Sequence, residues 1–458
     1  MLSISGARGI VGDSMTPAVA ADLAAAFGSW ARETSGSTQP IVCLGRDTRP
    51  SSEMLTAAAA AGLDAVGARV IDLGVVPTPT VGIMVSDRGA AGGMMITASH
   101  NPAEWNGLKC IGADGAAPPR SEVDRILRFF RERDFYMAQP REHTARERDG
   151  RGNDLHVGIV LAQVDVAAIR SAGLRSVLDS VNGAGAAPGR ALLEALGCTV
   201  VHLNPQHEGR FARGPEPVPQ NITELARRTA DERAHVGFAQ DPDADRLALV
   251  DEQGRCIGEE YTLVLAARRW LDLHGGGPIV TNLSTSRMID DVAAACPGAT
   301  VHRTPVGEAH VVQGMQQTGA TIGGEGNGGV ILHPVCLIRD SLSAMALVLD
   351  LVAAACRPLS VIVAQLPTYV MAKHRFAIKP GDGSAVAEAI ERVKRSFAAA
   401  DHNTVDGLRM DLDDGWVHLR PSNTEPIVRL IAEARTAQRT QALIDEVVAA
   451  AELGSELE

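Results

Sequence analysis

The sequence predicts an α/β protein in which three related α/β domains are followed by a smaller C-terminal α+β domain. The first observation is the length of 458 residues, which suggests about three or four domains at roughly 100–200 residues each. The second is a recurring pattern of a β-branched run, an Ala- and Leu-rich stretch and another β-branched run. The third is that this alternation stops after Pro367.

The recurring pattern predicts three β-α-β units of about 30 residues, the length usual for such a unit. They cover residues 40–74, 175–204 and 277–307. The sequence identity between the units is low, so their relation is inferred from the pattern.

The remaining segments set the domain limits. A polar, charged stretch at 138–154 indicates a linker or an exposed hairpin. The tail has strand-like segments at 376–380 and 416–422 and helical segments at 384–400 and 436–453. We therefore expect domains at 1–150, 151–256, 257–365 and 366–458.

Composition and charge limit the partners that the protein can bind and the compartment in which we expect it. A formal net charge of −12 argues against nucleic acid, although local arginines can still attract a small anion. Seven cysteines without a C-x-x-C pair indicate reduced thiols. The N-terminus lacks a signal-peptide pattern, and no apolar run reaches the ~18 residues of a membrane span. We expect a soluble, cytoplasmic protein with no membrane partner.

The first chemical motif is MITASHNP at 95–102, followed by WNGLK at 105–109. An apolar strand would end in a small-residue turn that carries Ser99, with Lys109 ten residues later. This arrangement suits a nucleophile or a phosphoryl carrier, whereas a purely structural turn is the alternative. A serine hydrolase is less favoured, because no G-x-S-x-G surrounds Ser99.

The second motif is DPDADR at 241–246. Asp241, Asp243 and Asp245 would project from one side of an extended loop and form an oxygen site for Mg²⁺, since three close carboxylates repel each other without a cation. A solvated acidic turn is one alternative. An EF-hand is another, but Arg246 stands where that loop needs glycine, and both flanks look like strands.

The third motif is GGEGNGG at 323–329. Glu325 can accept hydrogen bonds from vicinal hydroxyls, and Asn327 can donate and accept. We expect the glycines at 326, 328 and 329 to leave open space for a ligand. A flexible hairpin loop is the alternative.

The fourth motif is RPSNTEP at 420–426, with Arg429 beyond it. Its guanidinium, hydroxyl, amide and backbone N–H groups suit a phosphate ester, and the groups expected to bind it are Arg420, Ser422, Asn423, Thr424 and Arg429. A capped helix start is the alternative.

With these four motifs in this order, the chain resembles the α-D-phosphohexomutase superfamily over essentially its whole length. Supporting stretches are ARGIVG with Arg8, GRDTRPSSE, LGVVPTPT, GPEP and TPVGE. The resemblance implies four domains around a central cleft. It also implies that Ser99 is phosphorylated and that Mg²⁺ is held by a phosphoserine oxygen of Ser99 and by the three aspartates.

The resemblance further implies roles for the basic residues. Arg8 and Lys109 would serve proton transfer and phosphate stabilisation. His100 would support the Ser99 loop, and Arg246 would assist the transferring phosphoryl group.

The implied reaction interconverts a hexose 1-phosphate and 6-phosphate, with a hexose 1,6-bisphosphate as intermediate and activator. Asn327-Gly328-Gly329 stands where many bacterial members carry Ser-Gly-His, and GEGNGG is more similar to archaeal-type members. Glucosamine phosphate is the leading substrate, and glucose or mannose phosphate is the alternative. A homodimer is one option for assembly. Two other classes are a Mg²⁺-dependent sugar-phosphate phosphatase and a non-catalytic sugar-phosphate binding protein.

Overall fold

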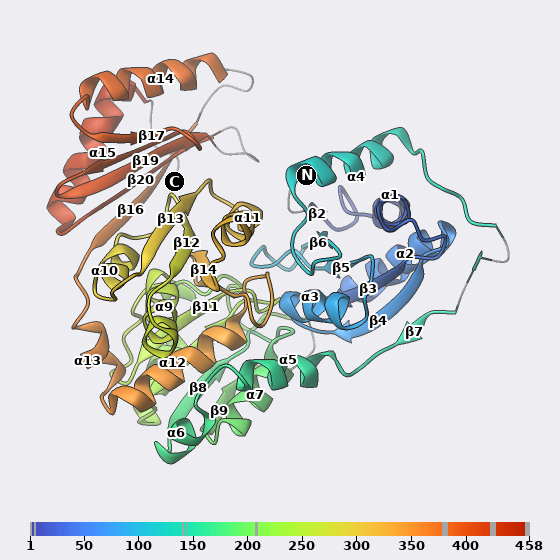
Figure 1. Ribbon diagram of the computed structural model, residues 1–458, viewed down its shortest axis with the longest axis horizontal. Helices are drawn as coiled ribbons and strands as arrows, with labels where there is room; N and C mark the ends of the chain where they lie inside the picture. Colours follow the sequence, from blue (N-terminus) through green and yellow to red (C-terminus); the bar gives the residue numbers. More distant parts are fainter. Residues whose placement is uncertain are drawn as a thin grey trace.

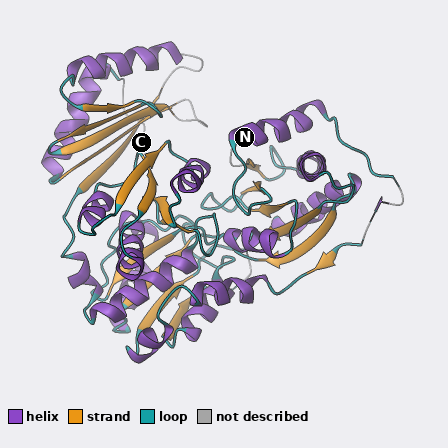
Figure 2. Ribbon diagram, viewed as in Figure 1, coloured by secondary structure: helices purple, strands orange, loops and turns teal. Residues whose placement is uncertain are grey.

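The computed structural model describes residues 2–3, 6–139, 142–143, 145–206, 209–377, 383–421 and 427–453. Within these residues the strands form four sheets in chain order, and helices pack against each sheet (Figures 1 and 2). The predicted fold class is confirmed, because three α/β domains precede an α+β domain.

The first domain has a mixed sheet with the strand order β1-β2-β6-β5-β3-β4-β7. Its strands are β1 (Leu2–Ser3), β2 (Gly6–Ile10), β3 (Ile41–Arg46), β4 (Arg69–Val75), β5 (Gly92–Ile96), β6 (Trp105–Ile111) and β7 (Glu147–Arg148). Its helices are α1 (Pro17–Ser35), α2 (Ser52–Ala65), α3 (Thr78–Asp87) and α4 (Arg120–Glu132). Thr16 caps α1 by accepting a hydrogen bond from the backbone N of Val19, and Gly36 ends it in the left-handed conformation.

The second domain has a four-stranded sheet with the order β11-β10-β8-β9. Its strands are β8 (Arg175–Asp179), β9 (Thr199–Leu203), β10 (Val236–Gln240) and β11 (Leu247–Asp251). Its helices are α5 (Gly152–Leu161), α6 (Val166–Ser171), α7 (Ala186–Ala195) and α8 (Thr223–Asp231), with a 3₁₀ turn at Pro219–Asn221.

The third domain repeats this arrangement with the order β13-β12-β14-β15. Its strands are β12 (Pro278–Asn282), β13 (Thr300–Thr304), β14 (Ile322–Glu325) and β15 (Gly329–Leu332). Its helices are α9 (Glu260–His274), α10 (Met288–Ala294), α11 (Glu308–Thr318), α12 (Ser341–Ala355) and α13 (Leu359–Val363). The three predicted β-α-β units are confirmed as β3-α2-β4, β8-α7-β9 and β12-α10-β13.

These three domains share one topology. The sheets contain the orders β6-β5-β3-β4, β11-β10-β8-β9 and β15-β14-β12-β13. When the four core strands of each domain are counted in chain order, every sheet places the fourth strand beside the third, the third beside the first and the first beside the second. The first three strands of each set are parallel, and the fourth is antiparallel. The connection from the third strand to the fourth therefore has the same place in every domain.

The fourth domain is an antiparallel sheet with the order β16-β20-β19-β18-β17. Its strands are β16 (Val370–Ala377), β17 (Asp401–Asn403), β18 (Leu408–Leu412), β19 (Gly415–Pro421) and β20 (Ile427–Ala434). Helices α14 (Gly383–Ser396) and α15 (Ala437–Ala451) cover one face (Figure 1). The predicted helices of the tail are thus confirmed.

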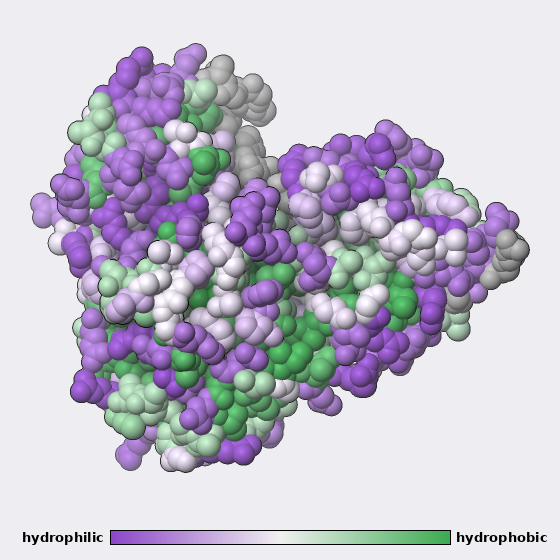
Figure 3. Space-filling model, viewed as in Figure 1, coloured by the Kyte–Doolittle hydropathy of each residue, from purple (hydrophilic) through white to green (hydrophobic). Residues whose placement is uncertain are grey.

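The three α/β domains share an apolar cluster, whereas the fourth domain has a separate one. One apolar cluster contains buried residues of all three α/β domains, among them Val81, Phe238 and Leu347. The fourth domain has its own apolar cluster around Met410 and Val417. In the space-filling view the surface is hollowed between the fourth domain and the first (Figure 3). None of the described helices combines the length and apolar character that a membrane span requires.

Candidate active site

Three of the four motifs occupy the equivalent connections of the three α/β domains. The Ser99 loop (97–104) joins β5 to β6, the aspartate loop (241–246) joins β10 to β11, and the Gly-rich loop (326–328) joins β14 to β15. Each follows the carboxyl end of a parallel strand, where open α/β sheets generally bind ligands. The shared topology therefore supplies one functional loop per domain.

Ser99 lies in a strained turn and faces the aspartate loop of the second domain. Its φ is 50°, a left-handed value that is uncommon for a residue with a side chain. Its backbone N donates to Thr97 Oγ1 at 2.8 Å. Its hydroxyl donates to Asp241 Oδ2 at 2.9 Å, and His100 Nδ1 is 3.3 Å away. The turn thus aims the hydroxyl at the predicted metal-binding carboxylates.

The buried Arg49 holds the Ser99 loop in place. Its guanidinium donates to the backbone carbonyls of Ser99 at 2.5 Å and Asn101 at 2.7 Å. It also donates to the carbonyls of Pro102 and Trp105, and its Nε pairs with Asp47 at 3.0 Å. We assigned no role to Arg49 from the sequence, although it lies in the GRDTRPSSE stretch that carries part of the resemblance.

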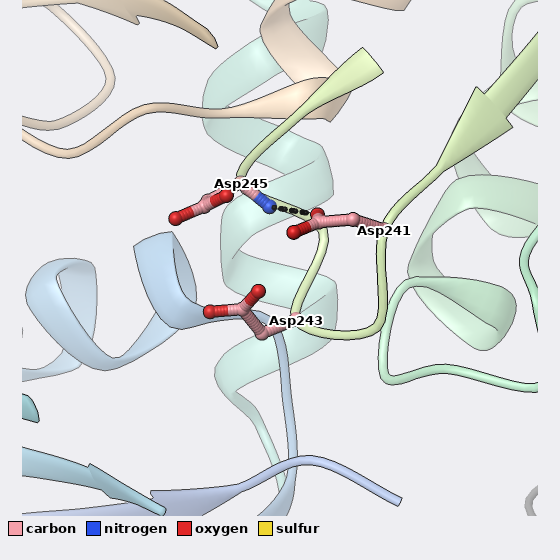
Figure 4. Close-up of side chains that lie close together, drawn as sticks. All are labelled: Asp241, Asp243 and Asp245. Atoms are coloured by element: carbon pink, nitrogen blue, oxygen red, sulfur yellow. Dashed lines mark hydrogen bonds between the residues drawn. The ribbon is translucent and has the colours of Figure 1, made fainter. Parts of the chain in front are cut away.

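The three aspartates converge, but not from an extended loop as expected (Figure 4). The segment is a tight turn in which Ala244 has a φ of 55° and its N donates to the carbonyl of Asp241 at 3.0 Å. Asp241 Oδ1 accepts from the backbone N atoms of Asp245 and Arg246, both at 3.1 Å. The flanking elements are strands, which excludes an EF-hand, and the buried carboxylates exclude a solvated acidic turn.

The oxygen atoms of this turn fit a divalent cation. One ligand oxygen from each aspartate lies within 4.8 Å of the others. Among the described residues, Asp243 Oδ1 and Asp245 Oδ1 are buried without a hydrogen-bond partner. Burial, followed by the charges of Asp245 and Asp243, holds the pKa of Asp241 well above its ordinary value. A bound Mg²⁺ would satisfy these oxygens and relieve the repulsion.

Basic groups approach the aspartates from the first domain. Lys109 Nζ contacts Asp243 Oδ2 at 2.7 Å and Asp245 Oδ2 at 3.0 Å. Burial lowers the pKa of Lys109, but the charges of Asp243 and Asp245 raise it more. Thr78 Oγ1, from the LGVVPTPT stretch, donates to Asp243 Oδ2 at 2.6 Å. The Oδ2 atoms of these two aspartates are therefore occupied, whereas their Oδ1 atoms, without a partner among the described residues, are available to a cation.

The other predicted catalytic groups lie around the Ser99 loop. Arg8 donates to Asn101 Oδ1 at 3.1 Å, and burial lowers the pKa of Arg8. Burial, together with the charges of Arg246 and Arg8, lowers the pKa of His100 well below its usual value, so its imidazole is neutral. Arg246 pairs with Glu216 of the GPEP stretch at 3.3 Å.

Glu325 is held by four donors. Its Oε1 accepts from Asn282 Nδ2 at 2.9 Å and from the backbone N of Gly307 at 3.1 Å. Its Oε2 accepts from Arg339 Nη1 at 2.7 Å and from Asn327 Nδ2 at 3.4 Å. Asn327 Oδ1 has no hydrogen-bond partner among the described residues, which leaves an acceptor available to a ligand hydroxyl.

The expectation of open space at the glycines of this loop is wrong. A Cβ atom at Gly326 would lie 2.0 Å from Glu260 Oε2, and one at Gly328 would lie 2.4 Å from the carbonyl oxygen of Leu247. A Cβ atom at Gly329 would lie 2.1 Å from Arg339 Cδ. The glycines are required because neighbouring groups already fill the space.

The fourth domain contributes a row of arginines. Arg420 of β19 and Arg375 of β16 both lie directly opposite Arg429 of β20, so the three share one face of the sheet. Such a row suits an anion. The predicted phosphate-binding residues Ser422, Asn423 and Thr424 lie outside the described residues. The described residues that follow the segment begin β20 at Ile427, so a strand and not a helix comes after it.

One contact ties this row to the third domain. Asp406 Oδ2 pairs with Arg420 Nε at 3.0 Å and accepts from the backbone N of Val306 at 3.0 Å. Val306 belongs to TPVGE, the stretch that also contacts Glu325 through Gly307. Polar contacts therefore connect the arginine row of the fourth domain to the TPVGE stretch and the Gly-rich loop of the third domain.

Comparisons with known proteins identify this arrangement. Models of the phosphoglucomutase/phosphomannomutase family match the chain as α/β/α domain I at 3–137, domain II at 155–254, domain III at 258–369 and the C-terminal domain at 382–450. A probable phosphoglucosamine mutase of Methanopyrus kandleri is 38% identical over 448 residues, which cover 97% of this chain and 96% of the relative.

Two further proteins agree with this assignment. A phosphoglucomutase/phosphomannomutase of Thermococcus kodakarensis is 36% identical over 444 residues, which cover 96% of each chain. A solved phosphoglucomutase/phosphomannomutase family protein of Burkholderia thailandensis superposes with a TM-score of 0.86 at 27% identity and covers 99% of both chains. The chain therefore belongs to the phosphoglucomutase/phosphomannomutase family of the α-D-phosphohexomutase superfamily, enzymes that transfer a phosphate between positions of a sugar.

Proposed function

We propose that this phosphohexomutase interconverts hexose 1-phosphate and hexose 6-phosphate with Ser99 as the phosphoryl carrier. The observation that supports this best is the geometry at Ser99, whose buried hydroxyl lies 2.9 Å from Asp241 Oδ2 and next to the Lys109–aspartate cluster. Lys109 and a cation held by the aspartates would offset the charge of a phosphoryl group on this hydroxyl.

The proposed cycle has two transfers. The bond from phosphorus to Ser99 Oγ breaks as a sugar hydroxyl attacks, which gives a bound 1,6-bisphosphate. After the bisphosphate turns around, Ser99 Oγ takes the other phosphoryl group. In each transfer the attacking hydroxyl loses a proton and the leaving oxygen gains one. Neutral His100, 3.3 Å from Ser99 Oγ, is placed to deliver a proton to that oxygen in the first transfer and to accept it in the second. Lys109, Arg8 and Arg246 stabilise phosphoryl charge, and the arginine row anchors the phosphate that does not react.

We also propose that Asp241, Asp243, Asp245 and a phosphoserine oxygen of Ser99 hold Mg²⁺. Bound there, Mg²⁺ supplies charge stabilisation for the transferring phosphoryl group. Chelation should abolish turnover, added Mg²⁺ should restore it, and Ca²⁺ should support it poorly because of its larger and looser coordination shell. Full turnover in excess chelator would contradict this assignment.

The proposed leading substrate is glucosamine phosphate, with glucose and mannose phosphates as weaker alternatives. Relatives named for glucosamine and for glucose and mannose support both. Glu325 and Asn327 would bind the 3- and 4-hydroxyls, which the three sugars share in configuration, so we expect the three kcat/KM values to agree within about 10²–10³-fold, ~3–4 kcal/mol.

The test is a side-by-side measurement of kcat/KM for the three hexose 1-phosphates, with hexose 1,6-bisphosphate present as activator. Efficient use of glucose or mannose 1-phosphate without detectable glucosamine 1-phosphate turnover would overturn the leading substrate. Release of inorganic phosphate in place of the 6-phosphate would instead indicate a phosphatase.

Two properties stay predictions. A cytoplasmic location is consistent with the seven cysteines, all of which are free thiols. A homodimer would be detected by size-exclusion chromatography with light scattering.

A further inference from the structure

Arg339 joins two parts of the site that come from different domains. It follows β15 and precedes α12, and only 9% of its surface is exposed. Its Nη2 contacts Asp245 Oδ2 at 2.8 Å and its Nη1 contacts Glu325 Oε2 at 2.7 Å. One guanidinium therefore bridges the aspartate loop of the second domain and the Gly-rich loop of the third.

The remaining contact fixes the guanidinium itself. Glu308 Oε2, at the start of α11, lies 2.9 Å from Arg339 Nε and accepts from the backbone N of Arg339 at 3.2 Å. Two edges of the guanidinium donate hydrogen bonds to carboxylates, and its Nε lies against Glu308 as an ion pair without hydrogen-bond geometry. Contacts on all three sides leave the planar fork little freedom to rotate. The orientation of Glu325 is thereby set relative to Asp245.

The glycine at 329 explains how Arg339 reaches this position. A Cβ atom there would lie 2.1 Å from Arg339 Cδ and 2.9 Å from Arg339 Cγ. The next contact, Asn327 Oδ1, is at 3.1 Å, and the backbone of Gly329 is not in the left-handed region. The need for glycine therefore comes from the side chain of Arg339 and not from backbone conformation.

We propose that Arg339 is a positioning residue, which fixes the sugar-binding carboxylate of Glu325 against the metal-loop carboxylate of Asp245, and that Gly329 leaves room for it. This inference rests on the proposed binding of sugar hydroxyls by Glu325. A lysine at 339 would carry the charge at a single point and would lack the planar fork that holds two carboxylates in a fixed relative orientation. Without the bridge, Glu325 keeps its donors at Asn282, Gly307 and Asn327 but loses the closest one, so its Oε2 is no longer fixed relative to Asp245 for the discrimination of hydroxyls.

The first test compares hexose 1-phosphate with its 3-deoxy and 4-deoxy analogues. In the wild-type enzyme we expect kcat/KM to fall about 10–100-fold when the hydroxyl that Glu325 binds is missing. In Arg339→Met this ratio should fall to within a few-fold of 1, and Arg339→Lys should not restore it. The matched control is Arg190→Met, an exposed arginine of α7 paired with Glu194, which should keep the wild-type ratio.

The second test uses Gly329→Ala, Arg339→Ala and the double variant. Gly329→Ala should reduce the hydroxyl discrimination as Arg339→Met does, because the new methyl group displaces the arginine. In the Arg339→Ala background the same substitution should cause little further loss, since the clash is gone. Gly329→Ala by itself keeps the proposal testable if the Arg339 variants are unstable.

The possible outcomes distinguish failure of the role of Arg339 from failure of hydroxyl binding by Glu325 and from failure of the proposed function. Wild-type discrimination that persists in Arg339→Met, or losses in kcat/KM that add in the double variant, would overturn the inference alone. An equal loss on hydroxylated and deoxy substrates would show a merely structural role and overturn it too. A wild-type ratio near 1 would overturn both the inference and the hydroxyl binding by Glu325. Absence of any hexose 1-phosphate turnover by the wild type would refute the proposed function.

Discussion

Ser99 shows how one residue depends on its surroundings for chemistry. A serine hydroxyl in an ordinary turn is a weak nucleophile. Here a left-handed φ of 50° aims it at Asp241, and the backbone N of Ser99 bonds to Thr97. The strain of that φ is sustained by the surrounding hydrogen bonds, as is usual at functional sites.

We predict that Ser99→Ala lowers kcat by several orders of magnitude. The substitution removes the oxygen that carries the phosphoryl group, so the loss should exceed the ~10²–10³-fold cost of removing a single electrostatic donor. Steady-state kinetics on hexose 1-phosphate with bisphosphate activator measures it. Ser171→Ala, on the exposed surface of α6, is the control and should be unchanged. Near-normal turnover by the Ser99 variant would refute the carrier role.

The loops at the ends of equivalent strands are the elements that carry this site. A short loop holds its side chains only if its backbone is held, and the Ser99 loop is held by Arg49 through the carbonyls of Ser99, Asn101, Pro102 and Trp105. Arg49 lies in the segment between β3 and α2, and from there its guanidinium reaches the backbone of the Ser99 loop.

We predict that Arg49→Lys lowers kcat about 10–100-fold with little change in KM. Lysine keeps the charge beside Asp47 but cannot reach all four carbonyls, so Ser99 shifts, and a misplacement of ~1 Å can cost about 10² in rate. The measurement is a kcat and KM comparison, with circular dichroism as the folding control. A wild-type kcat in the folded variant would contradict the positioning role of Arg49.

At the scale of the whole molecule, the fourth domain is attached to the third by polar contacts. His418 of β19 is fully buried, with its Nδ1 2.8 Å from Ser284 Oγ and its Nε2 2.7 Å from the carbonyl oxygen of Asp406. Because Nε2 faces a carbonyl, it carries the proton, and Nδ1 accepts from Ser284. The Arg287 side chain donates to Asp411 and to backbone carbonyls of the fourth domain, and the backbone N of Arg287 donates to Glu433 Oε1.

This attachment should weaken in mild acid. Burial lowers the pKa of His418 from 6.5 to about 4, outweighing the opposing effect of Asp406. Between these two values the unfolded chain binds the proton and the folded chain does not, so stability falls as pH drops from about 6.5 to about 4. The loss is on the order of 3 kcal/mol across that range.

We therefore predict that the unfolding temperature falls more between about pH 7.5 and about pH 5 in the wild type than in His418→Gln, which cannot titrate. Thermal denaturation of both proteins at the two pH values measures the difference. His143→Gln, at an exposed histidine, should keep the wild-type pH dependence. Equal pH dependence in wild type and His418→Gln would contradict the prediction.

By itself the sequence determined the fold class and the local motifs. The alternation of β-branched runs and Ala- and Leu-rich stretches marks each β-α-β unit, and the chemistry of Ser99, the three aspartates and Glu325 is visible in neighbouring residues. Those signals are local because helices and strands are stabilised over short stretches of chain. The prediction of an extended aspartate loop is wrong, because the left-handed conformation of Ala244 depends on the packing around it.

Only the tertiary structure decided which of these residues meet. The bond from Ser99 to Asp241 spans 142 residues, and the bond from Arg339 to Asp245 spans 94. Such pairs leave no periodic signal, because they follow from how whole domains pack. For the same reason the sequence assigns no role to Arg49, Arg339 and Asp406. The space beside the three glycines of the Gly-rich loop is occupied by Glu260, Leu247 and Arg339, which lie outside that loop in the sequence.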